Sequence, residues 1–371
     1  MGSIFKSGLS NAVSSGSDSS VVVVDIGSST LKILHGELDG KKVIVKNFSS
    51  ALSPAGMVGL SYYEDASKIA DPLSLRLDVL IESFSAASNR FIVSLPDNFS
   101  VIKYISLENT PPSKLIDAEV RKQIEGELPY QYDSWNVVSQ IIDRGEQGMN
   151  IIALATFKKN FEFVSRCLSE RVAEPDYVSI SSFLAHEMLY PYLESKQNEN
   201  IAVINMGNAT TCVSIFKGSN LRIIQNIFVG GHHFSSDVAG ARQISLSEAE
   251  AFKRNELFFL PEYAPQQEKV KNFGMIKNTF MELVRGIFFM FENYFTKYFE
   301  EKINEIIIFG GGANFKNIDI VISGLLNTPV KKASTIVKAY SESTGKEIDD
   351  ETVDLCLPML GSLFGGASDE S

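Results

Sequence analysis

The sequence is poor in cysteine, tryptophan and positive charge. Its 371 residues include three cysteines and one tryptophan, and 34 Lys and Arg against 45 Asp and Glu give a formal net charge of -11. Cys167, Cys212 and Cys356 lie far apart without a C-x-x-C spacing, so we expect reduced thiols and no disulfide framework. The acidic balance argues against a nucleic-acid partner, because neutralising phosphates requires clustered Lys and Arg.

The sequence also lacks long hydrophobic runs and hydrolase motifs. No segment reaches the roughly 18 apolar residues of a membrane helix, and residues 1–19 lack the apolar stretch of a signal peptide. We therefore expect a soluble cytoplasmic protein without direct membrane insertion, and a disordered tail at residues 1–19, which are rich in Ser and Gly. Neither H-E-x-x-H nor G-x-S-x-G occurs, so we predict no catalytic residue.

Glycine turns that follow apolar strands are the most informative feature that is present. They read DIGSST at residues 25–30, NMGNATT at 205–211 and GGGAN at 310–314. The first two repeat one pattern: an apolar strand, a polar residue, glycine, a turn with hydroxyl groups and a second apolar strand. Such turns direct backbone N–H groups and hydroxyls into one space, which suits phosphate oxygens. The pattern predicts an internally duplicated α/β chain that binds a phosphorylated ligand.

Two further segments have distinct patterns. Residues 99–174 read as strand, helix, strand, strand, helix, which predicts an inserted subdomain. Residues 267–301 read as one long helix. Its predicted apolar face carries Phe280, Val284, Ile287, Phe291, Phe295 and Tyr298, and is widened by Phe288 and Phe289.

The order of these motifs resembles that of the actin-like ATPase superfamily, which has two phosphate hairpins followed by an adenosine loop. Within it the chain resembles the PilM family of type IV pilus assembly proteins, from about residue 20 to residue 366. The segments that carry the resemblance are DIGSSTLK at 25–32, EVRKQIEGELPYQYDSW at 119–135, FVGGHHFS at 228–235, AEAFK at 249–253 and INEIIIFGGGAN at 303–314.

The resemblance implies an α/β actin-like ATPase fold, made of duplicated RNase H-like domains with an inserted β-α-β-β-α subdomain. The implied boundaries are 20–98, 175–199 and 350–371 for the first actin-like subdomain, 99–174 for the inserted subdomain, 200–244 and 302–349 for the second actin-like subdomain, and 245–301 for its helical lobe.

The resemblance also implies a site for ATP and Mg²⁺. Asp25 would hold the Mg²⁺ through water. Positions expected at the nucleotide are Gly27, Ser28, Ser29, Thr30 and Lys32 in the first turn, Asn205, Gly207, Thr210 and Thr211 in the second, Gly230 and Gly231 beside the phosphates, Glu250 and Lys253 on the ribose side, and Gly311, Gly312 and Asn314 around adenosine.

Two departures from the family pattern bear on catalysis. Asn205 stands where the second hairpin normally opens with Asp, so one negative charge near the metal is lost. Gly286, Phe288, Phe289 and Met290 stand where relatives often carry polar residues that face the nucleotide. We therefore predict nucleotide binding with little or no ATPase turnover.

The implied function is that of an adaptor at the inner face of the cytoplasmic membrane. It would bind the N-terminal cytoplasmic peptide of a PilN-like inner-membrane protein and act with other pilus assembly proteins. In the family this peptide lies between the first and the inserted subdomain, and candidate lining comes from residues 100–107 and 112–128. The identity of the partner, self-association, and pilus versus type II secretion stay open.

Two alternative functions share the fold. A small-molecule kinase would need a base near the γ-phosphate, and the sequence shows no distinctive substrate motif. An FtsA-like division protein usually ends in a membrane-binding amphipathic helix, whereas this sequence ends in GGASDES. Adjacent His232 and His233 would point to opposite faces of a strand, so we expect a solvated turn there and no metal site.

Overall fold

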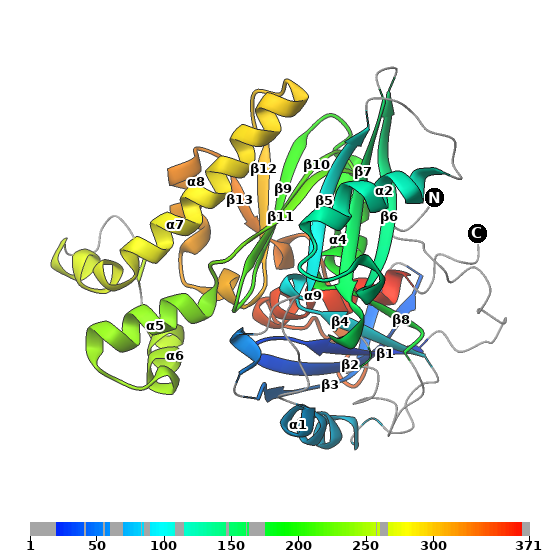
Figure 1. Cartoon of the computed structure of the whole chain (residues 1–371). Coiled ribbons are helices and arrows are strands. Elements are labelled where there is room, and N and C mark those ends of the chain that lie inside the picture. The colour runs from blue at the N-terminus through cyan, green and yellow to red at the C-terminus, as the bar shows by residue number, and fades with distance from the viewer. Residues whose placement is uncertain are drawn as a thin grey trace. The chain divides into compact units, whose positions relative to one another are not determined.

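A computed structural model describes most of the chain, in two compact units (Figure 1). The described residues are 20–40, 42–54, 56–59, 70–82, 84, 90–107, 115–145, 148–160, 162, 175–256, 258–259 and 266–365. The first unit comprises residues 1–188, 339–347 and 358–371, and the second comprises 189–338 and 348–357. The predicted tail at 1–19 and Cys167 lie outside the described residues, whereas Cys212 and Cys356 are buried free thiols.

The first unit is built on a six-stranded sheet with the order β14-β3-β2-β1-β4-β8. Its strands are β1 (Ser20–Ile26), β2 (Thr30–Asp39), β3 (Lys42–Leu52), β4 (Phe91–Leu95), β8 (Tyr177–Ile180) and β14 (Ala339–Ser341). Strands β1, β2 and β3 are antiparallel neighbours, and β4 runs parallel to β1. All seven residues of β1 are buried, which explains its unbroken apolar run. Helix α1 (Ala70–Glu82) packs on this sheet through Leu73 and Leu77.

The inserted segment forms a second, three-stranded antiparallel sheet in the first unit. Its strands β5 (Ser100–Leu107), β6 (Trp135–Gly145) and β7 (Gly148–Phe157) have the order β5-β7-β6. Helix α2 (Ile116–Ile124) covers one face with Ile116, Val120 and Ile124, which join a core that includes Trp135. Most of the second helix predicted here, over 158–172, lies outside the described residues. Short 3-10 helices occur at Met57–Gly59, Asp97–Phe99, Glu125–Glu127 and Tyr132–Ser134.

The second unit repeats the strand arrangement of the first. Its sheet has the order β11-β10-β9-β12-β13, with β9 (Asn200–Met206), β10 (Thr211–Lys217), β11 (Asn220–Ile227), β12 (Glu305–Phe309) and β13 (Val330–Lys332). Strands β9, β10 and β11 are antiparallel and β12 is parallel to β9, as β1, β2, β3 and β4 are in the first unit. The duplication predicted from the two glycine turns is thus present in the sheets.

Helices cover the second sheet. They are α5 (Gly231–Arg242), α6 (Leu246–Asn255), α7 (Gln266–Tyr298) and α8 (Ile318–Leu326), with 3-10 helices η7 (Gly311–Asn314) and η8 (Ala333–Thr335). The predicted core face of α7 is confirmed at Phe280, Ile287 and Phe291, which are buried. The prediction that Phe288 and Phe289 widen this face is wrong, because these rings are 55% and 62% exposed. Each residue turns a helix by about 100°, so Phe288 and Phe289 point about 100° and 200° away from buried Ile287 and face solvent.

Two helices contribute residues to both units. The division falls within α4 (Ser181–Ser195) and α9 (Asp350–Gly365). Residues 339–341, expected in the second subdomain, form β14, which pairs with β3 in the first unit. In the first unit α9 passes so close to α4 that a Cβ at Gly361 would lie 1.8 Å from the carbonyl oxygen of Leu184.

None of the helices in the described ranges combines the length and the apolar character needed to cross a bilayer.

Candidate functional site

The first glycine turn joins β1 to β2 and requires glycine at position 27. The Gly27 N–H donates to the carbonyl oxygen of Thr30 over 3.2 Å, and a Cβ at Gly27 would lie 2.5 Å from that oxygen. The Ser53 hydroxyl donates to the Gly27 carbonyl over 2.6 Å. The backbone is therefore held in a tight turn between Asp25 and Lys32.

Asp25 and Lys32 face one another across the β1–β2 hairpin and form a buried ion pair. Lys32 Nζ lies 2.5 Å from Asp25 Oδ2, and the Ser94 hydroxyl donates to Asp25 Oδ1 over 2.6 Å. The Ser181 hydroxyl lies 3.5 Å from the same Oδ1. A buried charge left without its partner is costly, so Asp25 and Lys32 stabilise one another in the folded protein.

Ser94 and Ser181 are not among the positions predicted from the sequence. Ser94 is a buried serine in an otherwise apolar strand, β4, whose parallel register places it beside Asp25. A lone hydroxyl in the apolar run RFIVSLP was the available signal. Ser181 carries no such signal, because it reaches Asp25 only through the folding of α4.

The second glycine turn, between β9 and β10, repeats the close approach of the first. A Cβ at Gly207 would lie 2.7 Å from the carbonyl oxygen of Thr210, with the same three-residue spacing as Gly27 and Thr30. The Thr211 hydroxyl donates to the Val229 carbonyl over 2.7 Å and ties this turn to the segment before α5.

The start of α5 packs directly on the second turn. A Cβ at Gly230 would lie 2.6 Å from the carbonyl oxygen of Asn208. The N–H groups of Gly231 and His232 donate to the carbonyls of Gly207 and Asn208, each over 2.9 Å. Glycine is required here because the two backbones touch.

The two histidines begin this helix, so the strand assumed for them was wrong. The ring nitrogen Nδ1 of His233 accepts the Gly230 N–H over 3.1 Å and caps the helix. Burial, with the nearby His233 and Lys253, lowers the pKa of His232 and so favours its neutral imidazole. Among the described residues no group of three or more His, Cys, Asp or Glu side chains could hold a metal ion.

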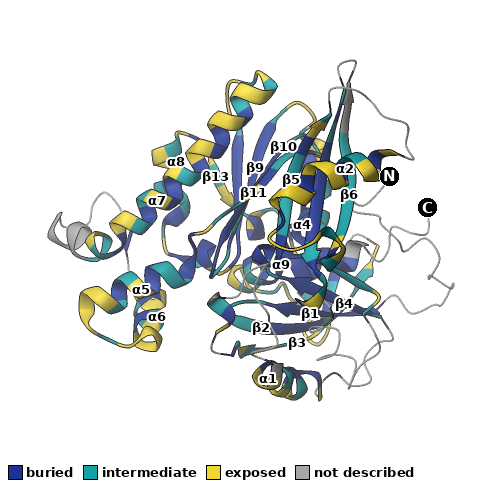
Figure 2. Cartoon of the chain, viewed as in Figure 1, coloured by how far each residue is buried: buried dark blue, intermediate teal, exposed yellow. Residues whose placement is uncertain are grey.

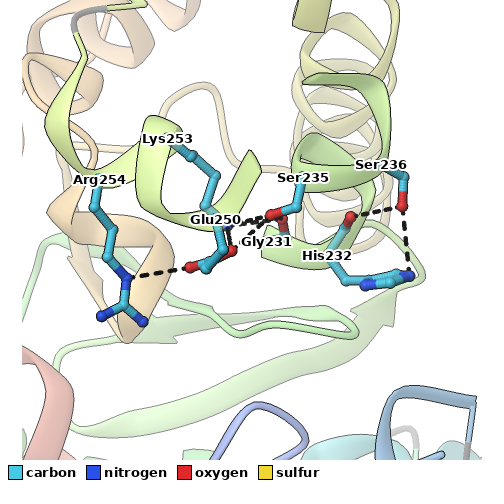
Figure 3. A network of polar contacts seen from close by, with 7 residues as sticks. All are labelled: Gly231, His232, Ser235, Ser236, Glu250, Lys253 and Arg254. Atoms are coloured by element: carbon cyan, nitrogen blue, oxygen red, sulfur yellow. Dashed lines mark hydrogen bonds and ion pairs between the residues drawn. The ribbon is translucent and has the colours of Figure 1, made fainter. Parts of the chain in front are cut away.

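Helix α6 is joined to the start of α5 by a polar network (Figure 3). Lys253 Nζ lies 2.5 Å from Glu250 Oε2, 2.9 Å from Ser235 Oγ and 3.0 Å from the Gly231 carbonyl oxygen. Burial lowers the pKa of Lys253, and Glu250 opposes that shift. Burial alone would raise the pKa of Glu250, but Lys253 and hydrogen bonds from Lys253 and Ser235 bring it below its ordinary value. The network fixes two charged groups beside the glycine turns.

The third glycine turn follows β12 and packs against the end of β9. Gly310 has a φ of +88°, and a Cβ there would lie 2.7 Å from Asn205 Oδ1. A Cβ at Gly312 would lie 2.8 Å from the Met206 Cβ. The Gly310 N–H donates to the Asp354 carbonyl over 2.9 Å.

In the second unit the structure brings the predicted positions to the carboxyl ends of β9 and β12. They are Asn205, Gly207, Thr210, Thr211, Gly230, Gly231, Glu250, Lys253, Gly311, Gly312 and Asn314. This is the end of a parallel pair where open α/β sheets bind ligands. In the first unit Asp25, Gly27, Ser28, Ser29, Thr30 and Lys32 share one hairpin.

Each glycine turn, taken within its own unit, has a shape that suits phosphate oxygens. Glycine allows a close backbone approach at each hairpin. Lys32 lies beside the turn of the first unit and Lys253 beside that of the second, and each is paired with a carboxylate. A Mg²⁺ ion beside Asp25 would take most of its ligands from phosphate and water, as Mg²⁺ commonly does.

Comparison with known proteins agrees with this geometry. The model of the family described as "Type IV pilus assembly protein PilM" matches residues 23–352. The solved "PilM-PilN type IV pilus biogenesis complex" superposes with a TM-score of 0.77 at 15% identity, over 94% of this chain and 98% of that one. MreB5 of Spiroplasma citri bound to ADP superposes with a TM-score of 0.51 at 13% identity, over 92% of this chain and 94% of that one.

A curated relative matches only locally. The ethanolamine utilization protein EutJ of Escherichia coli strain K12 is 41% identical over 58 residues, which is 16% of this chain and 21% of that protein. The matched part of the chain thus spans about a fifth of the length of this relative. The structural matches, all far below 25% identity, show the actin-like ATPase fold alone.

Proposed function

Because this chain belongs to the PilM family of type IV pilus assembly proteins, we propose that it is the cytoplasmic adaptor of the pilus assembly platform. In this role it binds Mg-ATP and the N-terminal peptide of a PilN-like inner-membrane protein, which holds it at the inner face of the cytoplasmic membrane. The observation that carries the proposal is the family match over residues 23–352, which includes both glycine hairpins and the whole inserted subdomain.

The two hairpins support the nucleotide part of the proposal. Both place glycine where a Cβ would collide with a carbonyl oxygen three residues later, at 2.5 Å in one and 2.7 Å in the other. Backbone N–H groups and hydroxyls of such turns bind phosphate oxygens. Bound Mg²⁺ would supply further charge neutralisation on the phosphates, with Asp25 ordering its water ligands.

The second turn supports binding with little turnover. Hydrolysis needs a group that orients or deprotonates the attacking water. Asn205 supplies an amide where a carboxylate would stand, and its Oδ1 lies beside the third turn, 2.7 Å from where a Gly310 Cβ would be. Residues 205–211 contain no Asp, Glu or His, so this turn offers no base.

The inserted sheet supports the peptide part of the proposal. Strand β5 is an edge strand in the order β5-β7-β6, so an extended peptide can add to it through backbone hydrogen bonds. Ile102 of β5 is half-buried and lies opposite Leu154 of β7, on the sheet face away from the α2 core. An apolar side chain of the peptide can pack on Ile102.

Thermal unfolding with Mg-ATP tests the nucleotide part. Ligand at 100 times its dissociation constant should stabilise the protein by about 2.7 kcal/mol. Measured against its own ligand-free melting temperature, Asp25→Ala should show no shift, whereas Asp71→Ala, which removes an exposed carboxylate on α1, should keep it. A robust phosphate-release rate that Asp25→Ala abolishes would contradict binding with little turnover.

Calorimetric titration with the synthetic N-terminal peptide of the PilN-like protein tests the partner. We expect Ile102→Glu to weaken binding at least about tenfold, because a carboxylate would have to be desolvated against the peptide. Val138→Glu is the matched control, since Val138 is also half-buried and faces Leu154 from β6, the other edge. Equal affinity of both variants and the wild type would refute the assignment to β5.

A further inference from the structure

The long helix α7 of the second unit has both buried and exposed residues along its length (Figure 2). Two adjacent phenylalanines, Phe288 and Phe289, are among the exposed ones. Phe288 is 55% exposed and Phe289 is 62% exposed, while Ile287 and Met290 on either side are buried. Single exposed apolar residues are common, but two large neighbouring rings in the C-terminal half of a long helix form a concentrated apolar surface. Core packing does not explain these rings, because the opposite face of α7 already fills the core.

Two exposed charges of opposite sign flank the rings on the same side of the helix. Arg285 lies one turn before Phe288 and Glu292 lies one turn after it, and both side chains are exposed. At about 100° per residue, Arg285, Phe288, Phe289 and Glu292 fall within roughly 100° of the helix circumference. The surface thus has an apolar centre, a positive end and a negative end.

This charge order is complementary to itself under a two-fold rotation. An axis midway between Phe288 and Phe289 is 3.5 positions from Arg285 and 3.5 positions from Glu292, about 5 Å in each direction along the helix. A second α7 running antiparallel therefore places its Glu292 opposite Arg285, and its Arg285 opposite Glu292. A parallel second copy would place like charges together.

We propose that this surface, made of Arg285, Phe288, Phe289 and Glu292 on α7, is a contact between two copies of this chain. The contact is isologous and antiparallel, with four phenyl rings at its centre and two reciprocal Arg285–Glu292 ion pairs at its rim. It lies wholly on the second unit and uses none of the residues proposed for nucleotide or peptide, so it stands independently of those assignments.

A contact centred on one helix per copy is small. Stable interfaces bury roughly 1,200–2,000 Å² in total, and a single helix pair lies at the low end of that range or below it. We therefore expect a reversible dimer whose population rises with protein concentration.

Sedimentation velocity of the full chain over a wide concentration range tests the contact. The wild type should pass from monomer to dimer, and Phe288→Glu/Phe289→Glu should remain monomeric. Phe299→Glu is the matched control, because Phe299 is 92% exposed but lies beyond the end of α7, and it should dimerise like the wild type.

Charge exchange tests the two-fold arrangement itself. Arg285→Glu alone and Glu292→Arg alone should each weaken the dimer about tenfold, because both ion pairs become like-charge contacts. The double variant Arg285→Glu/Glu292→Arg should restore wild-type association, since the pairs re-form with exchanged signs. A wild type that stays monomeric at every concentration, or a double variant no better than the single ones, would overturn the proposal.

Discussion

Removal of either partner of the Asp25–Lys32 pair should destabilise the first unit strongly. Both side chains are buried, at 7% exposure each, and their charged atoms lie 2.5 Å apart. Lys32→Met leaves a buried carboxylate with only hydroxyl donors, and Asp25→Asn leaves a buried ammonium facing an amide.

The expected size of this effect follows from burial. Breaking a buried ion pair by removing one partner costs about 3–5 kcal/mol, whereas replacing both partners is often close to neutral. We therefore expect Asp25→Asn/Lys32→Met to be less destabilised than either single variant. The exposed pair of Lys103 and Glu127, with side-chain exposures of 31% and 51%, is the control. Lys103→Met should cost no more than about 1 kcal/mol.

Urea unfolding followed by tryptophan fluorescence can measure these differences. Trp135 is the chain's single tryptophan and is buried in the inserted sheet, so its emission reports on the first unit. A Lys32→Met variant that loses no more stability than Lys103→Met, or a double variant less stable than both single variants, would contradict the expected cost of an unpaired buried charge.

Three further changes test individual contacts. Gly230→Ala should destabilise the second unit and abolish its thermal shift with Mg-ATP, because the new Cβ would lie 2.6 Å from the Asn208 carbonyl oxygen. Gly240→Ala is the control, because a Cβ there has open space around it, and it should stabilise α5 by about 0.5–1 kcal/mol. Ser245→Ala should cost about 1 kcal/mol in thermal unfolding, because Ser245 Oγ accepts the Glu248 N–H at the start of α6. Burial raises the pKa of Asp354 to about 6, so the folded state binds a proton more tightly than the unfolded chain and loses stability as pH rises from about 4 to about 6. Asp354→Asn should flatten this part of the pH dependence of urea unfolding.

Each of these three predictions can fail in a distinct way. Equal thermal shifts for Gly230→Ala and Gly240→Ala would show that the turns need no close approach. An unchanged melting temperature for Ser245→Ala would mean that the Ser245 cap does not stabilise α6. A pH dependence that is the same with and without Asp354→Asn would mean that another group titrates in this range.

Local sequence patterns predicted much of the fold because they report on local geometry. The strands that flank the glycine turns at 25–30 and 205–211, the strands of the inserted segment and the long helix over 267–301 are all present. In each case the signal is a turn residue or an apolar periodicity, which acts within a few positions of the chain.

The parts that were missed depend on contacts between distant segments. Pairing of Ala339 with Val43 joins residues almost 300 positions apart, and the three residues of β14 carry no local pattern that predicts this pairing. The start of α5 at Gly231 is fixed by carbonyls of the second turn, so two histidines that look like a strand or a turn become helical. Likewise the position of Ser94 beside Asp25 follows from the sheet register and that of Ser181 from α4, and only Ser94 has a local signal, as the one hydroxyl in an apolar run.

Counting surface pili by electron microscopy tests whether this chain serves type IV pilus assembly. A strain of the source organism without this gene should carry no pili, and a plasmid copy of the wild type should restore them. Normal piliation in the deletion strain, with or without a defect in protein secretion, would contradict the account.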